Sequence, residues 1–258
     1  MLGGTWYNRG MDAVARACPF PSHAPPVRVP LVVLADHDCS YLPGRVATSR
    51  AFFSSQLSPE LYHQFMDAGF RRSGRLVYQP ICRGCRACLP LRVPTDRFQP
   101  SKSQRRCWRG NQDLIITAGE PEPTDEKFAL YQRYQAEWHG KRAGEDHRES
   151  FEAFLYESPV ETVEMCYRNA AGDLVGVGIC DVAPRSLSSV YFYHDPAESK
   201  RGLGTFAALY EIALARSLGI AHYYLGYWVS GCGAMAYKAS FRPCEVLDGE
   251  GSWRVQQG

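Results

Sequence analysis

The feature that most constrains this chain is a group of three cysteines, Cys82, Cys85 and Cys88, separated by two residues each. Thiolates at this spacing can bind one zinc ion or an iron–sulfur cluster, and such a site fixes the loop that carries it. A closed site needs a fourth ligand, and Cys39 is the candidate because it lies in the same half of the chain. Four reduced thiols without a metal are the alternative interpretation.

The charge of the chain is divided between two regions. Between Arg71 and Arg109 there are eleven lysines and arginines and one acid, Asp96, although the whole chain has a net charge of only +2. Residues 112–173 instead hold fourteen acids and six basic residues. This separation favours binding of a polyanion such as a nucleic acid at the basic region. A solvated surface of uneven charge is the alternative.

The composition excludes several classes of protein. No apolar run approaches the ~20 residues that a membrane-spanning helix needs, and the first thirty residues lack the apolar core of a secretory signal. Cys166 and Cys180 lie in apolar runs that resemble strands, where a cysteine commonly acts as a small buried hydrophobe. We therefore expect a reducing, cytoplasmic setting and no membrane partner.

Apolar periodicity and turn residues predict a mixed α+β protein in three parts. Residues 1–30 are rich in proline, glycine and alanine and are predicted to form a flexible arm. The run from Glu120 to Pro123 alternates glutamate with proline and predicts a domain boundary. It separates a cysteine- and arginine-rich domain, residues 31–120, from a C-terminal domain, residues 121–258.

Secondary structure is predicted along most of the chain. Ser58 and Pro59 suit the start of a helix that ends before Gly69. Further helices are predicted at 125–138, 151–156 and 203–218. Strands are predicted at 31–35, 76–81, 89–93, 114–117, 161–167, 174–182, 189–193 and 221–229. The last two strands flank a helix, which allows them to form a parallel pair.

Aromatic residues are interspersed among the arginines of the basic region. Guanidinium groups pair with phosphates and stack on bases, and single-stranded RNA ends are recognised by such stacking. The acceptor end of a tRNA satisfies both requirements, so we expect RNA rather than DNA as the partner. The residues predicted to bind tRNA or substrate include Arg45, Arg71, Arg72, Arg75, Arg92, Arg105 and Arg106.

A glycine-rich segment, Ser199 to Thr205, lies between a predicted strand and a predicted helix. Backbone N–H groups at such a position, here those of Gly204 and Thr205, can bind an anion. The segment is similar to the loop with which GNAT acetyltransferases bind the pyrophosphate of CoA. It departs from that loop in either alignment, because Ser199 replaces the leading Gln/Arg or Phe206 replaces the final small residue. This departure argues against CoA.

Several segments occur together in an order that is typical of one family. In the N-terminal half they are 39–45, 69–74, 78–88 and 100–106, and in the C-terminal half they are 195–196, 203–205, 224–227 and 235–238. On these motifs, over about residues 31–248, the chain resembles the arginyl-tRNA–protein transferase family. The greatest resemblance is to its bacterial branch, the aspartate/glutamate leucyltransferases.

The resemblance implies a GNAT-like fold, with two such units packed together, and transfer of an amino acid from aminoacyl-tRNA to a protein's N-terminal amine. In the bacterial branch, leucine from leucyl-tRNA is placed on N-terminal Asp or Glu as a mark for N-degron degradation. Eukaryotic members bind a metal or cluster partly through Cys-Gly-Tyr-Cys, whereas this chain has Leu42 in place of the second cysteine. The chemistry itself is expected to need no cofactor. A structural zinc or iron–sulfur cluster remains an expectation.

The implied reaction is aminolysis of an ester, which needs positioning and stabilisation of an oxyanion more than a strong base. As catalytic candidates, Asp181 and Tyr191 are placed near the amine, and Tyr227 and Lys238 near the oxyanion or acceptor. Arg45, Arg92 and Lys238 are candidates for binding the acceptor's carboxylate. The alternatives are arginine as the donor amino acid, a non-catalytic RNA-binding module stapled by metal, and a CoA acetyltransferase.

Overall fold

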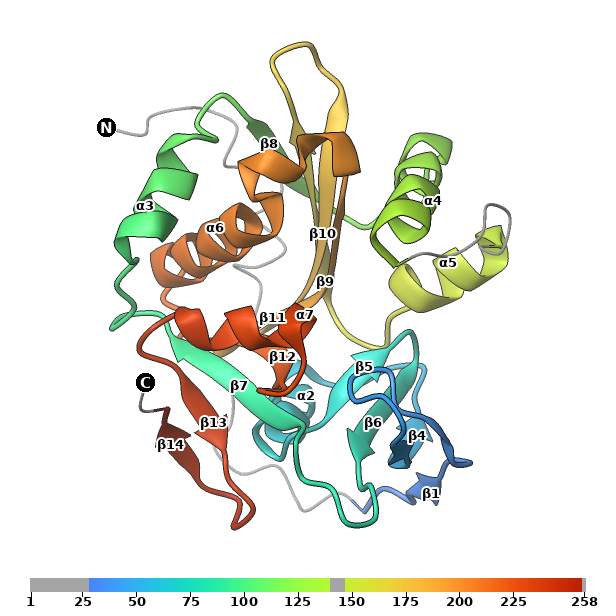
Figure 1. The fold of residues 1–258 in the computed structure, drawn as a ribbon. Helices are drawn as coiled ribbons and strands as arrows, with labels where there is room; N and C mark the ends of the chain where they lie inside the picture. The colour runs from blue at the N-terminus through green and yellow to red at the C-terminus, as the bar shows by residue number, and fades with distance from the viewer. Residues whose placement is uncertain (1–27, 140–146, 257–258) are drawn as a thin grey trace.

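The computed structural model describes residues 28–139 and 147–256, and Figure 1 shows their fold. A twisted sheet of eight strands forms the centre, and a four-stranded sheet and a two-stranded ribbon accompany it. The mixed α+β fold class predicted from the sequence is confirmed, and its division into two GNAT-like units stays a prediction. The predicted N-terminal arm lies outside the described residues except for its last three positions.

The large sheet combines strands from both predicted domains. Its strands are β7 (Leu89–Pro94), β8 (Ile115–Gly119), β9 (Thr162–Arg168), β10 (Leu174–Ala183), β11 (Ser186–His194), β12 (His222–Trp228), β13 (Glu245–Leu247) and β14 (Trp253–Val255). They are ordered β14-β13-β7-β12-β11-β10-β9-β8. Because β7 pairs with both β12 and β13, the two predicted domains share one sheet, and their boundary stays a prediction.

The N-terminal half contributes the smaller sheets. The four-stranded sheet contains β1 (Val32–Val33), β4 (Ser49–Phe53), β6 (Leu76–Pro80) and β5 (Arg71–Ser73), and the ribbon contains β2 (His37–Asp38) and β3 (Val46–Ala47). The strand β5 pairs antiparallel with β6 at the edge of its sheet. In a strand, neighbouring side chains point to opposite faces, so successive residues of β5 meet different surroundings.

Helices cover both faces of the large sheet (Figure 1). On one face lie α3 (Lys102–Arg109) and α6 (Leu203–Ser217), and on the other lie α4 (Asp125–His139) and α5 (Arg148–Leu155). With apolar layers on both sides, all ten residues of β10 are buried. None of the helices among the described residues is long and apolar enough to cross a membrane.

Two predicted helices form for the reasons that the sequence gives. In α2 (Pro59–Asp67), the Ser58 side chain accepts a hydrogen bond from the Leu61 amide and Pro59 occupies the first turn, as predicted. The helix α6 follows Gly202, which has a positive φ of 66°. Sequence reasoning missed α3, although its capping box of Ser101 and Gln104 was a usable signal.

The strands β11 and β12 form the one parallel pair among the described strands, and α6 connects them as predicted. They pair only where Ser186–Ser188 face His222–Tyr224. Beyond these residues each strand continues, but it pairs only with its outer neighbour, β10 or β7. The two strands therefore diverge, and their inner carbonyl groups need other hydrogen-bond donors.

Candidate anion-binding site at the diverging strands

Two basic side chains supply the donors at the point where β11 and β12 diverge. Arg71 extends from β5, and its Nη2 donates a hydrogen bond to the Ser189 carbonyl of β11 at 2.6 Å. Lys238 lies in the short 3₁₀ helix η3 (Tyr237–Ser240), and its Nζ donates to the Tyr227 carbonyl of β12 at 3.1 Å. Each cation thus donates a hydrogen bond to one carbonyl of one strand, and both cations lie in the space between the two strands.

Gly226 provides the room in which the two cations meet. A Cβ atom at this position would lie 3.5 Å from Lys238 Nζ and 3.7 Å from Arg71 Nη2. The backbone φ of Gly226 is 81°, which side chains rarely adopt, so glycine is favoured here for two reasons. A small residue therefore keeps open the side of the strand that both cations approach.

Neither cation has a carboxylate at ion-pair distance within the described residues. Arg71 is only 7% exposed, and its Nη1 has no hydrogen-bond partner in this part of the chain. Burial, together with the neighbouring Arg71 charge, lowers the pKa of Lys238 to about 7. Buried charges are ordinarily paired, because desolvating an unpaired one is costly. Arg71, which is buried, and Lys238, which is half-buried, are two unpaired cations with spare donors and form a site suited to an anion.

Arg72, the next residue of β5, has the opposite surroundings. It forms a fully buried, two-point ion pair with Asp181, with distances of 2.7 Å from Nε and 2.6 Å from Nη2. Asp181 also accepts from the Tyr62 hydroxyl at 2.6 Å and from the Thr162 hydroxyl at 3.0 Å. The arrangement ties α2 and β5 to β10, and it favours a structural role for Asp181 over contact with the acceptor amine.

The two tyrosines predicted to be catalytic are held by other groups. The Tyr227 hydroxyl donates to the Gly69 carbonyl at 2.9 Å, and burial raises its pKa far above the ordinary value. The Tyr191 hydroxyl accepts from Gln135 Nε2 of α4 at 2.8 Å. Tyr227 therefore contributes its backbone carbonyl, which holds Lys238, while Tyr191 packs among aromatic residues beneath α4 and α5.

The four predicted metal ligands gather near this site. Cys39, Cys82 and Cys88 line a cavity of about 280 Å³ together with Tyr227, and Cys85 lines an adjoining one. Burial and the nearness of the other three thiols raise the pKa of Cys88 to about 11. In the described part of the chain, no three Cys, His, Asp or Glu side chains are arranged to hold a metal ion. The metal centre stays a prediction.

The remaining predicted arginines divide into exposed and paired groups. Arg45, Arg105 and Arg106 are exposed, and no carboxylate among the described residues lies at ion-pair distance from them. Arg75 is exposed and contacts Glu157 at 3.2 Å. Arg92 binds Glu245 and Asp67, each at 2.8 Å, and its guanidinium covers the Trp253 ring. The guanidinium group of Arg92 is therefore already engaged in contacts within the fold.

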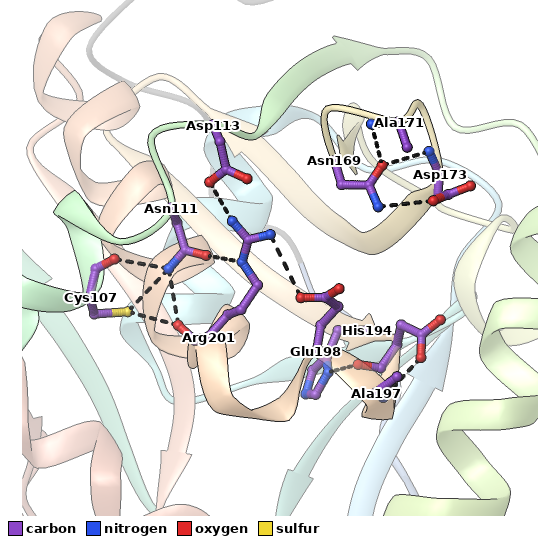
Figure 2. Close-up of polar contacts among 11 residues, drawn as sticks. Cys107, Asn111, Asp113, Asn169, Ala171, Asp173, His194, Ala197, Glu198 and Arg201 are labelled. Carbon is purple, nitrogen blue, oxygen red and sulfur yellow. Dashed lines mark hydrogen bonds and ion pairs between the residues drawn. The ribbon is translucent and has the colours of Figure 1, made fainter.

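The glycine-rich segment is held by α3 and by the residues that follow it. Figure 2 shows that Arg201 donates to Asn111 and contacts two carboxylates, those of Asp113 and Glu198. The Cys107 thiol donates to the Arg201 carbonyl at 3.5 Å. Gly204 and Thr205 follow in the half-exposed first turn of α6. Because Arg201 is already paired with acids, this loop differs from a pyrophosphate-binding loop in contacts as well as in sequence.

Sequence reasoning missed a buried acid close to the diverging strands. Glu211 lies on the inner side of α6, is 1% exposed and accepts a hydrogen bond from the Tyr223 hydroxyl of β12. Burial raises its pKa to about 7, and the Tyr223 hydrogen bond opposes this shift. The available signal was a single acid within a helix whose other residues are mostly apolar.

Two family models match the chain and define its class. They describe the N terminus and the C terminus of arginine-tRNA-protein transferase, and they match residues 37–106 and 126–248. Together the matched segments include β5, β12 and η3, which carry the cationic site. The chain is an aminoacyltransferase of the aminoacyl-tRNA–protein transferase class.

Comparison with individual proteins places the chain within that class. It is 44% identical over 236 residues to an aspartate/glutamate leucyltransferase from Halorhodospira halophila, covering 89% of this chain and 98% of the relative. It is 42% identical to one from Stenotrophomonas maltophilia, with coverages of 83% and 88%. The chain belongs to the arginine-tRNA-protein transferase family and is similar to its aspartate/glutamate leucyltransferases.

Comparison with solved structures gives only weak matches. The chain matches L-PGS from Bacillus licheniformis with a TM-score of 0.43 and 13% identity, over 69% of this chain and 52% of that one. It matches FemX with a TM-score of 0.43 and 8% identity, over 76% and 79% of the two chains.

Proposed function

We propose that the protein transfers leucine from leucyl-tRNA to the α-amine of proteins that begin with Asp or Glu. Two kinds of observation support this proposal. The similar proteins are named aspartate/glutamate leucyltransferases, and the diverging strands hold two cations, one buried and one half-buried, without a carboxylate partner among the described residues. The cation pair carries the proposal, because both the acceptor and the reaction intermediate are anionic.

The chemistry requires a neutral amine and a stabilised oxyanion. A free α-amine has a pKa of ~7.7–8.0, so an appreciable fraction is already neutral near pH 7. Its attack on the leucyl ester produces a tetrahedral intermediate with a negative oxygen, which buried N–H donors stabilise. Lys238 is the donor assigned to this oxygen, because its ammonium has two hydrogens beyond the one given to Tyr227.

Collapse of the intermediate releases the ribose oxygen of the tRNA end, and this oxygen must receive a proton. A group with a pKa near the working pH is suited to proton transfer. Burial gives Lys238 a pKa of about 7, so we assign it this second task as well. The ester supplies the driving force, so no step of this reaction needs a cofactor. The four cysteines are assigned a structural role beside the site.

The tRNA is proposed to bind through the exposed arginines rather than through the buried ones. Arg45 lies in the turn of the β2–β3 ribbon, and Arg105 and Arg106 lie on α3. Exposed guanidinium groups bind phosphates with little desolvation and make binding sensitive to salt. We further propose that the reaction takes place in the cytoplasm and that the added leucine marks the acceptor for degradation.

The direct test is transfer of labelled amino acid by the purified protein. Leucyl-tRNA and arginyl-tRNA are each combined with peptides that begin with Asp, Glu, Asn or Arg. We expect label on the Asp and Glu peptides with leucyl-tRNA. Label from arginyl-tRNA alone would show that the transferred amino acid is arginine and not leucine. No transfer in any combination would contradict the proposed function.

A further inference from the structure

Arg71 has a donor group that the fold does not use. Its Nη2 binds the Ser189 carbonyl, whereas its Nη1 has no hydrogen-bond partner among the described residues. The side chain is 7% exposed, so its charge is largely withdrawn from solvent. We infer that Arg71 determines acceptor specificity by binding the side-chain carboxylate of an N-terminal Asp or Glu. This inference rests on the proposed function.

The other candidate cations are less suited to this task. Arg92 is already paired with Glu245 and Asp67, and Arg72 is paired on two sides with Asp181. Arg45 is exposed in a turn, where water would weaken its discrimination between a carboxylate and an amide. Among these arginines, Arg71 alone combines burial with an unused donor within the described part of the chain.

Arg71 and Lys238 lie next to each other but are proposed to bind different anionic groups. Arg71 binds the acceptor's side-chain carboxylate, and Lys238 binds the oxyanion of the intermediate. Both side chains approach Gly226, so an acceptor whose carboxylate contacts Arg71 places its α-amine in the region that Lys238 faces. Asp and Glu carry both groups on one residue, only a few bonds apart. The planar guanidinium can bind a carboxylate through N–H donors in a fixed geometry, which an ammonium cannot match.

The same geometry explains rejection of the neutral amides. Asn and Gln have nearly the shapes of Asp and Glu, but each replaces one carboxylate oxygen by an NH₂ donor. That donor would face the N–H groups of Arg71, and the buried charge would remain unpaired. Sites that bind a polar group in this way reject the analogue that lacks it by ~10⁴–10⁵ at best. We expect at least a hundredfold preference for Asp over Asn.

The test compares kcat/KM for Asp and Asn peptides at saturating leucyl-tRNA. In the Arg71→Met variant we expect the Asp rate to fall at least a hundredfold and the preference for Asp over Asn to shrink below tenfold. Arg71→Lys retains the charge without the planar fork and is expected to be intermediate. The matched control is Arg75→Met, since Arg75 is exposed beside the same hairpin and should leave the preference unchanged.

A second pair of variants keeps the test independent of Arg71 itself. Gly226→Ala places a methyl group against both cations, whereas Gly219→Ala has a similar φ of 71° but nothing within 4 Å of its Cβ. We expect the first to reduce the Asp preference and the second to leave it intact. An Arg71→Met protein that keeps the wild-type Asp/Asn ratio would overturn the inference. Wild-type protein that transfers no leucine would instead defeat the proposed function.

Discussion

Arg71 and Arg72 are adjacent in β5 and are both buried, yet their surroundings differ completely. Arg72 is closed within a hydrogen-bonded pair with Asp181, which also accepts from Tyr62 and Thr162. Arg71 holds one carbonyl, approaches Lys238 and keeps an unused donor. The first arrangement serves folding, because every charge is compensated. The second leaves charge uncompensated, and such a site is suited to binding a ligand.

The largest effect is expected from breaking the paired region. Asp181→Ala leaves Arg72 buried without its partner, which typically costs ~3–5 kcal/mol of unfolding free energy. The double variant Asp181→Leu with Arg72→Met removes both charges and should recover much of that loss. As a surface control, Glu157→Ala removes the exposed partner of Arg75 and should change stability by less than ~1 kcal/mol.

These free energies would be measured by denaturant unfolding. A loss below ~1 kcal/mol in Asp181→Ala would contradict the structural role assigned to the pair. Equal losses in the single and double variants would show that the packing of these side chains, rather than charge compensation, determines the stability.

The second effect concerns Glu211, the buried acid near the opening of the strands. Its pKa is about 7 in the folded protein against an ordinary value of 4.5, so the folded state retains a proton that the unfolded chain releases. The resulting stability is complete below about pH 4.5 and is lost as pH rises to about 7. Glutamine does not titrate. As pH rises through this window, the free energy of unfolding of Glu211→Gln should therefore increase relative to that of wild type, by on the order of 3 kcal/mol.

Thermal unfolding at a series of pH values measures this difference, with Glu149→Gln as the control at an exposed glutamate. Parallel stability curves for wild type and Glu211→Gln would show that Glu211 is ionised in the folded protein throughout.

A smaller effect is expected from fixing the charge of Lys238. Its pKa is about 7, so it is charged below that pH and neutral above it. In Lys238→Arg the charge persists, although the geometry is worse. The ratio of kcat/KM of Lys238→Arg to that of wild type should therefore rise with pH above 7, approaching ~10-fold per pH unit. Profiles of identical shape for the two proteins would remove Lys238 from the proton and oxyanion steps.

The smallest effect is expected at the exposed arginines of α3. The double variant Arg105→Gln with Arg106→Gln should weaken leucyl-tRNA binding several-fold and reduce the slope of log K against log salt by ~1–2. Acceptor preference should not change, because these side chains are exposed to solvent and are not part of the cation pair. A change in the Asp/Asn ratio without a change in salt dependence would reverse the roles given to surface and buried arginines.

Local signals in the sequence predicted the helices α2 and α6 and the parallel β11–β12 pair. Caps, glycine stops and apolar periodicity act within a few residues, so they can be recognised without the fold. The pairing of Arg72 with Asp181 and the approach of Arg71 to Lys238 depend on contacts between distant segments. Charge type alone does not say which arginine of an adjacent pair finds a carboxylate. Sequence reasoning therefore placed both arginines in one group that binds tRNA or substrate, whereas the structure buries both in different surroundings.

The central claim is that buried Arg71 binds the acceptor, whereas buried Arg72 stabilises the fold through its pair with Asp181. The most direct test measures the melting temperature and the Asp/Asn preference on the same Arg71→Met protein, beside Asp181→Ala. We expect Arg71→Met to lose its preference for Asp and to melt much closer to the wild-type temperature than Asp181→Ala does, because removal of the uncompensated charge offsets loss of the hydrogen bond to the Ser189 carbonyl. A melting temperature lowered as far as in Asp181→Ala, with the Asp preference unchanged, would contradict the claim.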